Sequence, residues 1–188
     1  MRKNDCLRTE LPFLLNQEIL PSTFPFAEEA FNTGPPDAIN LWIGNEHSTS
    51  SMHKDHYENL YYVSHGEKII TLCPPSNVIF LNELDFDCGS FCHNEGGWKV
   101  KPENYKVKWI QCDNVETSRN DLQYTNPITI KVKAGEMLYI PSLWYHRVTQ
   151  SCETVAINYW FDMKFDMKWC YYNFLQNLSM ERNKNKST

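Results

Sequence analysis

The stretch SSMHKDHYENLYYVSHGEK, residues 50–68, combines histidines and carboxylates with strand-forming residues. If this run is a β-strand, His53 and Asp55 lie two residues apart and point to the same face. An imidazole and a carboxylate side by side could supply two ligands to a divalent cation. His146, in IPSLWYHRV, is the best third ligand. Two histidines and one carboxylate form the facial set of non-haem Fe(II) oxygenases, which leaves coordination positions open for substrate and oxygen.

A His-x-Asp pair alone is weak evidence, because a histidine beside a carboxylate is often only a hydrogen-bonded pair. Lys68 follows the turn HGE. An inward ammonium at that position requires an anionic partner, and the distal carboxylate of an organic acid could be that partner. A solvated lysine at a strand end is the alternative interpretation.

Four further polar side chains could serve the same ligand. The hydroxyls of Ser50 and Tyr61 could donate hydrogen bonds to its carboxylate. Asn59 and Asn158 are amides in apolar runs, and they could orient the ligand or the residues around the metal.

Short β-patterned runs separated by turns must position these residues. The expected strands are 38–44, 51–64, 68–75, where two prolines stop the run, 78–82, 106–113 and 127–136, followed by three runs between 136 and 162. The polar stretch 84–106 is expected to be a long loop. Many short strands in one domain predict a mainly β sandwich or double-sheet jelly roll, which could bring the early His53 and the late His146 together.

Two flanking segments frame this β domain of residues 38–163. Residues 1–37 contain five prolines, which predicts an irregular arm with a short helix near 26–32. Residues 164–188 begin with an amphipathic rhythm that predicts a C-terminal helix, followed by a polar tail.

Composition limits the function classes. The 188 residues are 41% hydrophobic and 14% aromatic, with a net charge of −5 and a pI near 5.7, which fits one globular domain and argues against nucleic acid as a partner. We expect no membrane span and no signal peptide. The seven cysteines predict reduced thiols in a cytoplasmic or nuclear protein. Cys88, Cys92 and His93 could form half of a zinc site, with two ordinary loop thiols as the favoured alternative.

The segments HKDHYENLYYVSHGEK, AGEMLYIPSLWYHRV and AINYWFDMKFD resemble the JmjC oxygenases over nearly the whole chain, and most of all the lysyl hydroxylases among them. The resemblance implies a cupin-like double-stranded β-helix that uses Fe(II), 2-oxoglutarate and O2. It assigns the iron to His53, Asp55 and His146. Lys68 and Ser50 would then bind 2-oxoglutarate, and Asn59, Tyr61 and Asn158 would line its pocket.

The resemblance also implies (3S)-hydroxylation of a lysine in a developmentally regulated GTP-binding protein, with a homodimer left open. Relatives carry a substantial region before the barrel, so we expect a shortened chain. The alternatives are a histone-tail endopeptidase, an inactive JmjC binding module, and a cupin-like metal protein that does not use oxygen. Glu58, Asp85 and Asp87 are candidate contacts for a substrate lysine, although strand alternation points Glu58 outward.

Overall fold

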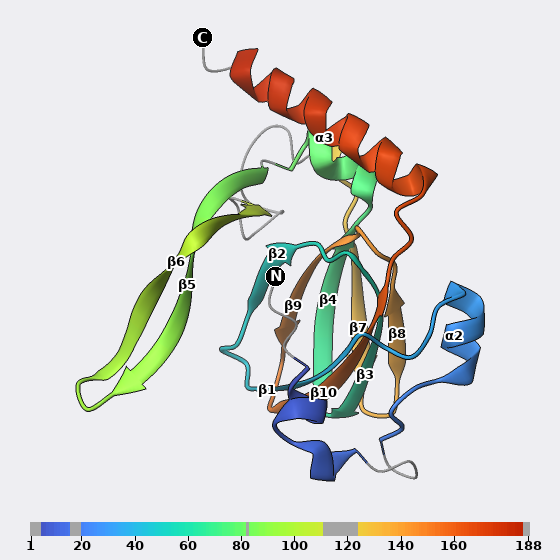
Figure 1. The fold of residues 1–188 in the computed structure, drawn as a ribbon, viewed down its shortest axis with the longest axis vertical. Coiled ribbons are helices and arrows are strands. Elements are labelled where there is room, and N and C mark those ends of the chain that lie inside the picture. Colours follow the sequence, from blue (N-terminus) through green and yellow to red (C-terminus); the bar gives the residue numbers. More distant parts are fainter. Residues whose placement is uncertain (1–4, 16–19, 82, 111–123, 186–188) are drawn as a thin grey trace.

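The computed structural model describes residues 5–15, 20–81, 83–110 and 124–185, without the side chains of 183–185. Two four-stranded antiparallel sheets face each other and form a barrel (Figure 1). The first sheet has the strand order β1 (Ala38–Gly44), β10 (Thr154–Asp162), β3 (Tyr57–His65) and β8 (Met137–Ile140). The second has the order β2 (Ser50–His53), β9 (Tyr145–Gln150), β4 (Glu67–Cys73) and β7 (Ile128–Lys133). The predicted mainly β, cupin-like jelly roll is confirmed.

The two sheets bury an apolar interior between them. Alternate residues of each strand point inward, as the pleat of a strand requires. The interior cluster includes Tyr61 and Val63 from β3, Ile70 and Leu72 from β4, and Val148 from β9. Every strand that carries a candidate site residue also contributes to this cluster or pairs with a strand that does. The site therefore stands on a packed scaffold.

The N-terminal arm covers the outer face of the first sheet. It contains α1 (Cys6–Thr9), the 3-10 helix η1 (Pro12–Leu14) and α2 (Pro25–Phe31). Leu7 and Ala27 are fully buried against outward residues such as Leu60 and Tyr159. Asp5 accepts a hydrogen bond from the backbone N–H of Ile39, at 2.9 Å, and so ties α1 to β1.

The C-terminal helix α3 (Met167–Asn185) lies across one end of the barrel, at the top of Figure 1. Its inner face packs Trp169, Tyr172 and Leu175 onto that end. Its outer face exposes a second apolar stripe, formed by Met167, Tyr171, Phe174 and Leu178. The helix is predicted correctly, but it is apolar on two faces rather than one. None of the described helices is both long and apolar enough to cross a membrane.

Three expected elements differ from the structure. The run 51–64 is two strands, β2 and β3, because the charged segment Lys54–His56 carries the chain from one sheet to the other. The expected strand 78–82 begins instead with the end of a 3-10 helix, η2 (Pro75–Ile79), whose first residue is a proline, a residue that favours the first turn of a helix. Position 82 and positions 111–113 lie outside the described residues.

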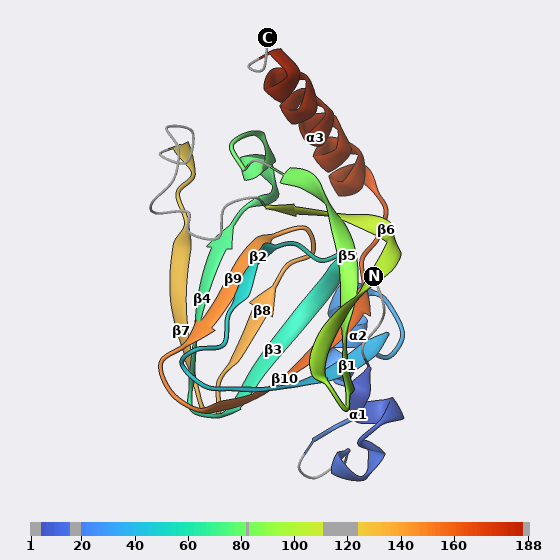
Figure 2. The same cartoon turned by 90° about the vertical axis from the view of Figure 1, so that its left-hand side faces the viewer.

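The expected loop 84–106 is a long β-hairpin, formed by β5 (Glu83–Asn94) and β6 (Gly97–Ile110). It projects from the barrel beside β1 and β2 (Figures 1 and 2). Gly97, with φ +92°, turns the chain where a side chain would be strained. Frequent charges obscure the alternation in the sequence, since Asp85 pairs with Lys108 and Asp87 with Lys106 across the two strands.

Candidate metal centre

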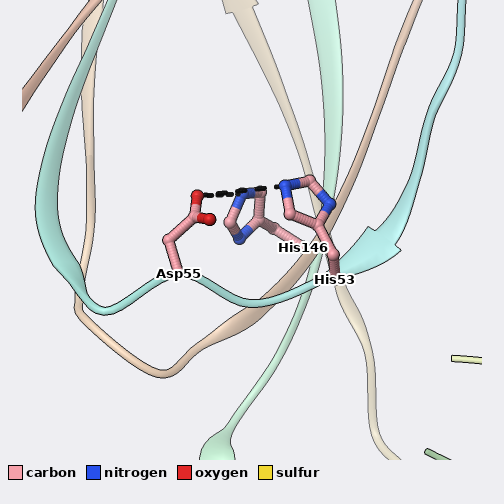
Figure 3. A group of neighbouring side chains, drawn as sticks. All are labelled: His53, Asp55 and His146. Carbon is pink, nitrogen blue, oxygen red and sulfur yellow. Dashed lines mark ion pairs between the residues drawn. The ribbon is translucent and has the colours of Figure 1, made fainter. Parts of the chain in front are cut away.

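The three predicted ligands converge at one end of the barrel interior (Figure 3). His53 ends β2 and His146 lies directly across from it on β9, with ring centroids 4.3 Å apart. Nε2 of His53 lies 3.9 Å and Nε2 of His146 lies 3.5 Å from the same carboxylate oxygen of Asp55. Within the part of the chain that the structure describes, these three residues form the one group of three or more His, Cys, Asp or Glu side chains that could hold a metal ion.

Asp55 reaches the site by a different route from the one predicted. It does not share a strand with His53, because β2 ends at His53 and Asp55 lies in the crossing to β3. Backbone hydrogen bonds fix this crossing, from Leu143 N to Asp55 O at 2.9 Å and from Met163 N to His56 O at 3.3 Å. Leu143 has φ +67°, a left-handed conformation that costs ~1–2 kcal/mol in a non-glycine residue. The turn before β9 is therefore held in an uncommon shape beside the carboxylate.

The hydrogen bonds of the two imidazoles leave their Nε2 atoms available. Nδ1 of His53 bonds to the carbonyl of Ser51 at 2.7 Å, and Nδ1 of His146 bonds to the carbonyl of Trp144 at 3.0 Å. A carbonyl can only accept, so each neutral ring carries its proton on Nδ1 and offers a lone pair from Nε2. Both oxygens of Asp55 are buried without a hydrogen-bond partner. Two lone pairs and an orphaned carboxylate converge, and this donor set fits a divalent cation.

The electrostatics favour the ligand protonation states. Burial, and next the neighbouring His146, lowers the pKa of His53 to about 4. Burial alone would raise the pKa of Asp55, but the contact with His146 and the charges of His53 and His56 outweigh it, so this pKa lies below its ordinary value. At neutral pH, His53 is therefore neutral and Asp55 is ionised, as metal ligation requires.

A cavity of about 600 Å³ opens in front of these ligands. Four of the residues predicted from the sequence line it together with the three ligands, namely Ser50, Asn59, Tyr61 and Asn158. The side-chain amide of Asn158 donates to Asn59 Oδ1 at 3.3 Å and accepts from Trp42 Nε1 at 2.9 Å. Trp42 thus fixes the orientation of the predicted amide pair.

Lys68 points inward, as one of the two interpretations required, and is 5% exposed. It does not line the cavity, and its Nζ donates a hydrogen bond to Gln150 Oε1 at 2.6 Å. Lys68 and Gln150 are cross-strand partners on β4 and β9. His146 pairs with Leu72, which lies four residues after Lys68 on β4. At the usual rise of a strand, the Lys68–Gln150 pair is therefore ~13 Å from the Leu72–His146 pair. Burial lowers the pKa of Lys68 to about 8.

The sequence does not indicate the partner of Lys68 or several of the residues that line the cavity. Gln150 could have been found from strand alternation, because it shares a face of β9 with His146 and Val148. Trp42 and Trp160 lie in recognised strands, but no local pattern indicates which aromatic residues face a cavity. The sequence does not place the hairpin residues Ser90, Tyr105 and Trp109 at the cavity, because it predicts a loop over 84–106 and no partner strand for 106–113.

The candidate acidic contacts lie elsewhere. Glu58 points away from the cavity, as predicted, but it is buried rather than solvated. It accepts hydrogen bonds from Tyr139, from Ser142 and, at 2.9 Å, from Lys168 Nζ. Asp85 and Asp87 are exposed on the hairpin in ion pairs with lysines.

The cysteines of the considered zinc half-site also lie on the hairpin. Cys88 and Cys92 are free thiols on β5, and Cys92 is exposed. The ring of His93 packs against Trp98, at a centroid distance of 5.1 Å.

The family model described as "Cupin-like domain" matches residues 1–167. The chain belongs to the cupin-like, JmjC-type family. JmjC domain-containing protein E of Dictyostelium discoideum is 39% identical over 98% of this chain. The lysine-specific demethylase JMJ32 of Arabidopsis thaliana is 37% identical over 94%. The human bifunctional peptidase and (3S)-lysyl hydroxylase JMJD7 is 41% identical over 92%.

These matches cover 60%, 56% and 56% of the respective JmjC relatives, so the chain spans a little more than half of their length. The His53–Asp55–His146 group has the donor set of the Fe(II) site in JmjC oxygenases.

Proposed function

We propose that this chain is an Fe(II)- and 2-oxoglutarate-dependent oxygenase that hydroxylates a lysine side chain of a protein. The observation that carries the proposal is the convergence of two imidazole lone pairs and an unpartnered buried carboxylate at the end of a 600 Å³ cavity. Membership of the JmjC family and the likeness to a (3S)-lysyl hydroxylase support it.

Each part of the site has a role in this proposal. His53, Asp55 and His146 would hold Fe(II). When bound, this iron supplies the oxidising chemistry, in which O2 and 2-oxoglutarate give succinate and CO2 while one oxygen atom enters a C–H bond. Lys68, which would turn from Gln150, binds the distal carboxylate of 2-oxoglutarate in a charge-assisted hydrogen bond, with Ser50 and Tyr61 as hydroxyl donors.

The remaining residues shape the pocket. Asn59 and Asn158, oriented by Trp42, present amides to the cosubstrate. The aromatic walls, which include Trp160, exclude water from the reacting centre. The substrate lysine enters past the hairpin, whose Ser90 and Tyr105 line the cavity. A developmentally regulated GTP-binding protein is the proposed substrate.

The test is mass spectrometry of a lysine-bearing peptide from such a GTP-binding protein. The peptide is incubated in air with the protein, Fe(II), ascorbate and 2-oxoglutarate. We expect a gain of one oxygen on lysine, which disappears without 2-oxoglutarate and with His146→Ala.

Other outcomes contradict the proposal in different ways. A methylated peptide that loses a methyl group would indicate a demethylase, the activity named for one of the relatives. Shortened peptides would indicate an endopeptidase, as part of the name of another relative suggests. An unchanged peptide together with no 2-oxoglutarate binding would indicate a non-catalytic module.

A further inference from the structure

The hairpin β5–β6 reaches the candidate metal centre through one side chain, Trp109. Its indole ring lies parallel to the imidazole of His53, with an interplanar angle of 3° and a centroid distance of 4.8 Å. The indole Nε1–H donates to Ser51 Oγ at 2.7 Å. Ser51 also provides the carbonyl that accepts the Nδ1–H of His53, at 2.7 Å. Trp109 therefore holds both the ring of the ligand and the residue to which that ring is hydrogen bonded.

We propose that Trp109 is a positioning residue, which sets the orientation of the His53 imidazole toward the metal from the base of the hairpin. The inference rests on the proposed metal site and extends it to a residue outside the barrel. The direction of the Nε2 lone pair depends on rotation of the imidazole about the bond that joins the ring to Cβ. A hydrogen bond from Nδ1 restrains this rotation through a single atom of the ring. The flat face of the indole adds a second restraint, because a rotating imidazole would collide with the ring stacked on it.

The hairpin is suited to this coupling because it borders the cavity as well as the ligand. Trp109, Tyr105 and Ser90 all line the cavity. The carboxylate of Glu103 on β6 accepts a hydrogen bond from the Ser90 hydroxyl on β5 at 2.7 Å. This bond connects the two strands beside the cavity. A peptide that contacts this part of the hairpin would thus press on the same element that holds His53. The metal geometry and the substrate would then depend on each other.

Packing alone is the competing explanation for Trp109, and a second tryptophan on the same strand separates the two. Trp98 is 72% exposed near the tip of β6 and contacts His93 rather than the ligands. Trp98→Leu is therefore the matched control for Trp109→Leu. Trp109→Phe keeps a stacked ring but lacks the N–H donor, and Ser51→Ala removes only the acceptor for that donor.

The experiment titrates the full chain with Co(II), without cosubstrate or oxygen chemistry, and records the visible absorption band of the bound ion. Thermal melting of each metal-free variant is measured alongside. We expect Trp109→Leu to weaken Co(II) binding by about tenfold, the range found for residues that orient metal ligands, and to change the shape of the band. Trp109→Phe and Ser51→Ala should each weaken Co(II) binding by less than Trp109→Leu does. Because both remove the same hydrogen bond, their losses of affinity should not add in the double variant.

Several results would overturn the inference. One is an unchanged dissociation constant and band in Trp109→Leu. Another is an equal loss in Trp98→Leu, which would indicate general loosening of the hairpin. If Trp109→Leu does not fold, an unchanged band and dissociation constant for both Trp109→Phe and Ser51→Ala would overturn it. A wild-type chain that binds no Co(II) overturns this inference and the metal site together. Co(II) binding without lysine hydroxylation contradicts only the proposed function.

Discussion

His53 and His146 are direct cross-strand partners on β2 and β9, although the first comes early in the barrel and the second near its end. Their pairing places two imidazoles in one row of a sheet. Each ring is tied by Nδ1 to a backbone carbonyl two residues earlier in its own chain segment. The two histidines of the site are thus placed by strand register, which is more rigid than a set of loops.

Replacing Asp55 by Asn should abolish metal binding, because it removes the anionic ligand between the two histidines while keeping its size. Addition of Co(II) at about 100 times its dissociation constant should stabilise the wild type by ~2.7 kcal/mol. We expect the melting temperature of Asp55→Asn to be insensitive to the ion. His47→Ala, a histidine with an 83% exposed side chain, serves as the control and should respond as the wild type does. A metal-dependent shift in Asp55→Asn would contradict the ligand assignment.

The affinity for 2-oxoglutarate should fall as the pH rises through about 8. Burial lowers the pKa of Lys68 to about 8, so the free protein loses the ammonium above that pH and with it the charged partner of the distal carboxylate. Lys68→Met should weaken binding by ~1.5–3 kcal/mol at pH 7 and flatten the pH dependence. Calorimetry between pH 7 and 9 measures both effects. Lys131→Met, on the neighbouring strand with a 64% exposed side chain, should retain the wild-type profile. If the affinity of Lys68→Met for 2-oxoglutarate fell with pH as steeply as that of the wild type, the titration would belong to another group.

Breaking the buried ion pair of Lys54 and Glu83 should strongly destabilise the fold. Both side chains are at least nine-tenths buried, and Lys54 also faces the rings of Tyr145 and Tyr172. Lys54→Met leaves a buried carboxylate without its cation, so we expect a loss of ~3–5 kcal/mol in the free energy of unfolding. The double variant Lys54→Met/Glu83→Leu should recover much of this loss.

The exposed pair of Asp85 and Lys108 provides the comparison for that experiment. Its N–O distance is 3.3 Å, but the two side chains are 57% and 38% exposed. Lys108→Met should therefore cost less than ~1 kcal/mol. Urea denaturation of the variants measures the difference, and equal losses for the buried and exposed pairs would refute the argument from burial.

Glu58 should make the docking of α3 sensitive to acid. Burial alone would raise its pKa, but hydrogen bonds from Lys168, Tyr139 and Ser142 outweigh this effect and lower it. Because the folded pKa is depressed, the stabilisation is present above the ordinary value of 4.5 and is lost as the pH falls below it. Glu58→Gln should be less stable at pH 7 and show a weaker loss of stability between pH 5 and 3. Acid titration followed by circular dichroism tests this, and a parallel loss in both proteins would exclude Glu58 as the source.

The sequence was sufficient to predict the mainly β architecture and the convergence of His53, Asp55 and His146. The residue types and their strand context carry that information, but the predicted position of Asp55 on the same strand as His53 is wrong. His53 and Asp55 do not share a strand face; instead the chain changes sheets between them. Local alternation cannot reveal such a crossing, because it depends on which strands become neighbours.

The hairpin was missed for a related reason. Cross-strand pairs such as Asp85 with Lys108 give β5 and β6 a charged face, and a charged, glycine-containing stretch resembles a loop in sequence. Trp109 therefore could not be placed beside His53, since this contact requires a partner strand that the sequence pattern did not indicate. The hydrogen bond of Lys68 to Gln150 likewise depends on register across two strands.

The crossing at Lys54–His56 gives metal binding a mechanical consequence. His53 ends a strand of one sheet, and two residues after Asp55 the chain begins a strand of the other. A cation held by both residues would link the two sheets at this crossing. Amide hydrogens at the ends of β2, β3 and β9 would then exchange with solvent more slowly as metal concentration rises, while those of the distant edge strand β7 would keep their rates. The metal concentration would then determine how often these strand ends open to solvent.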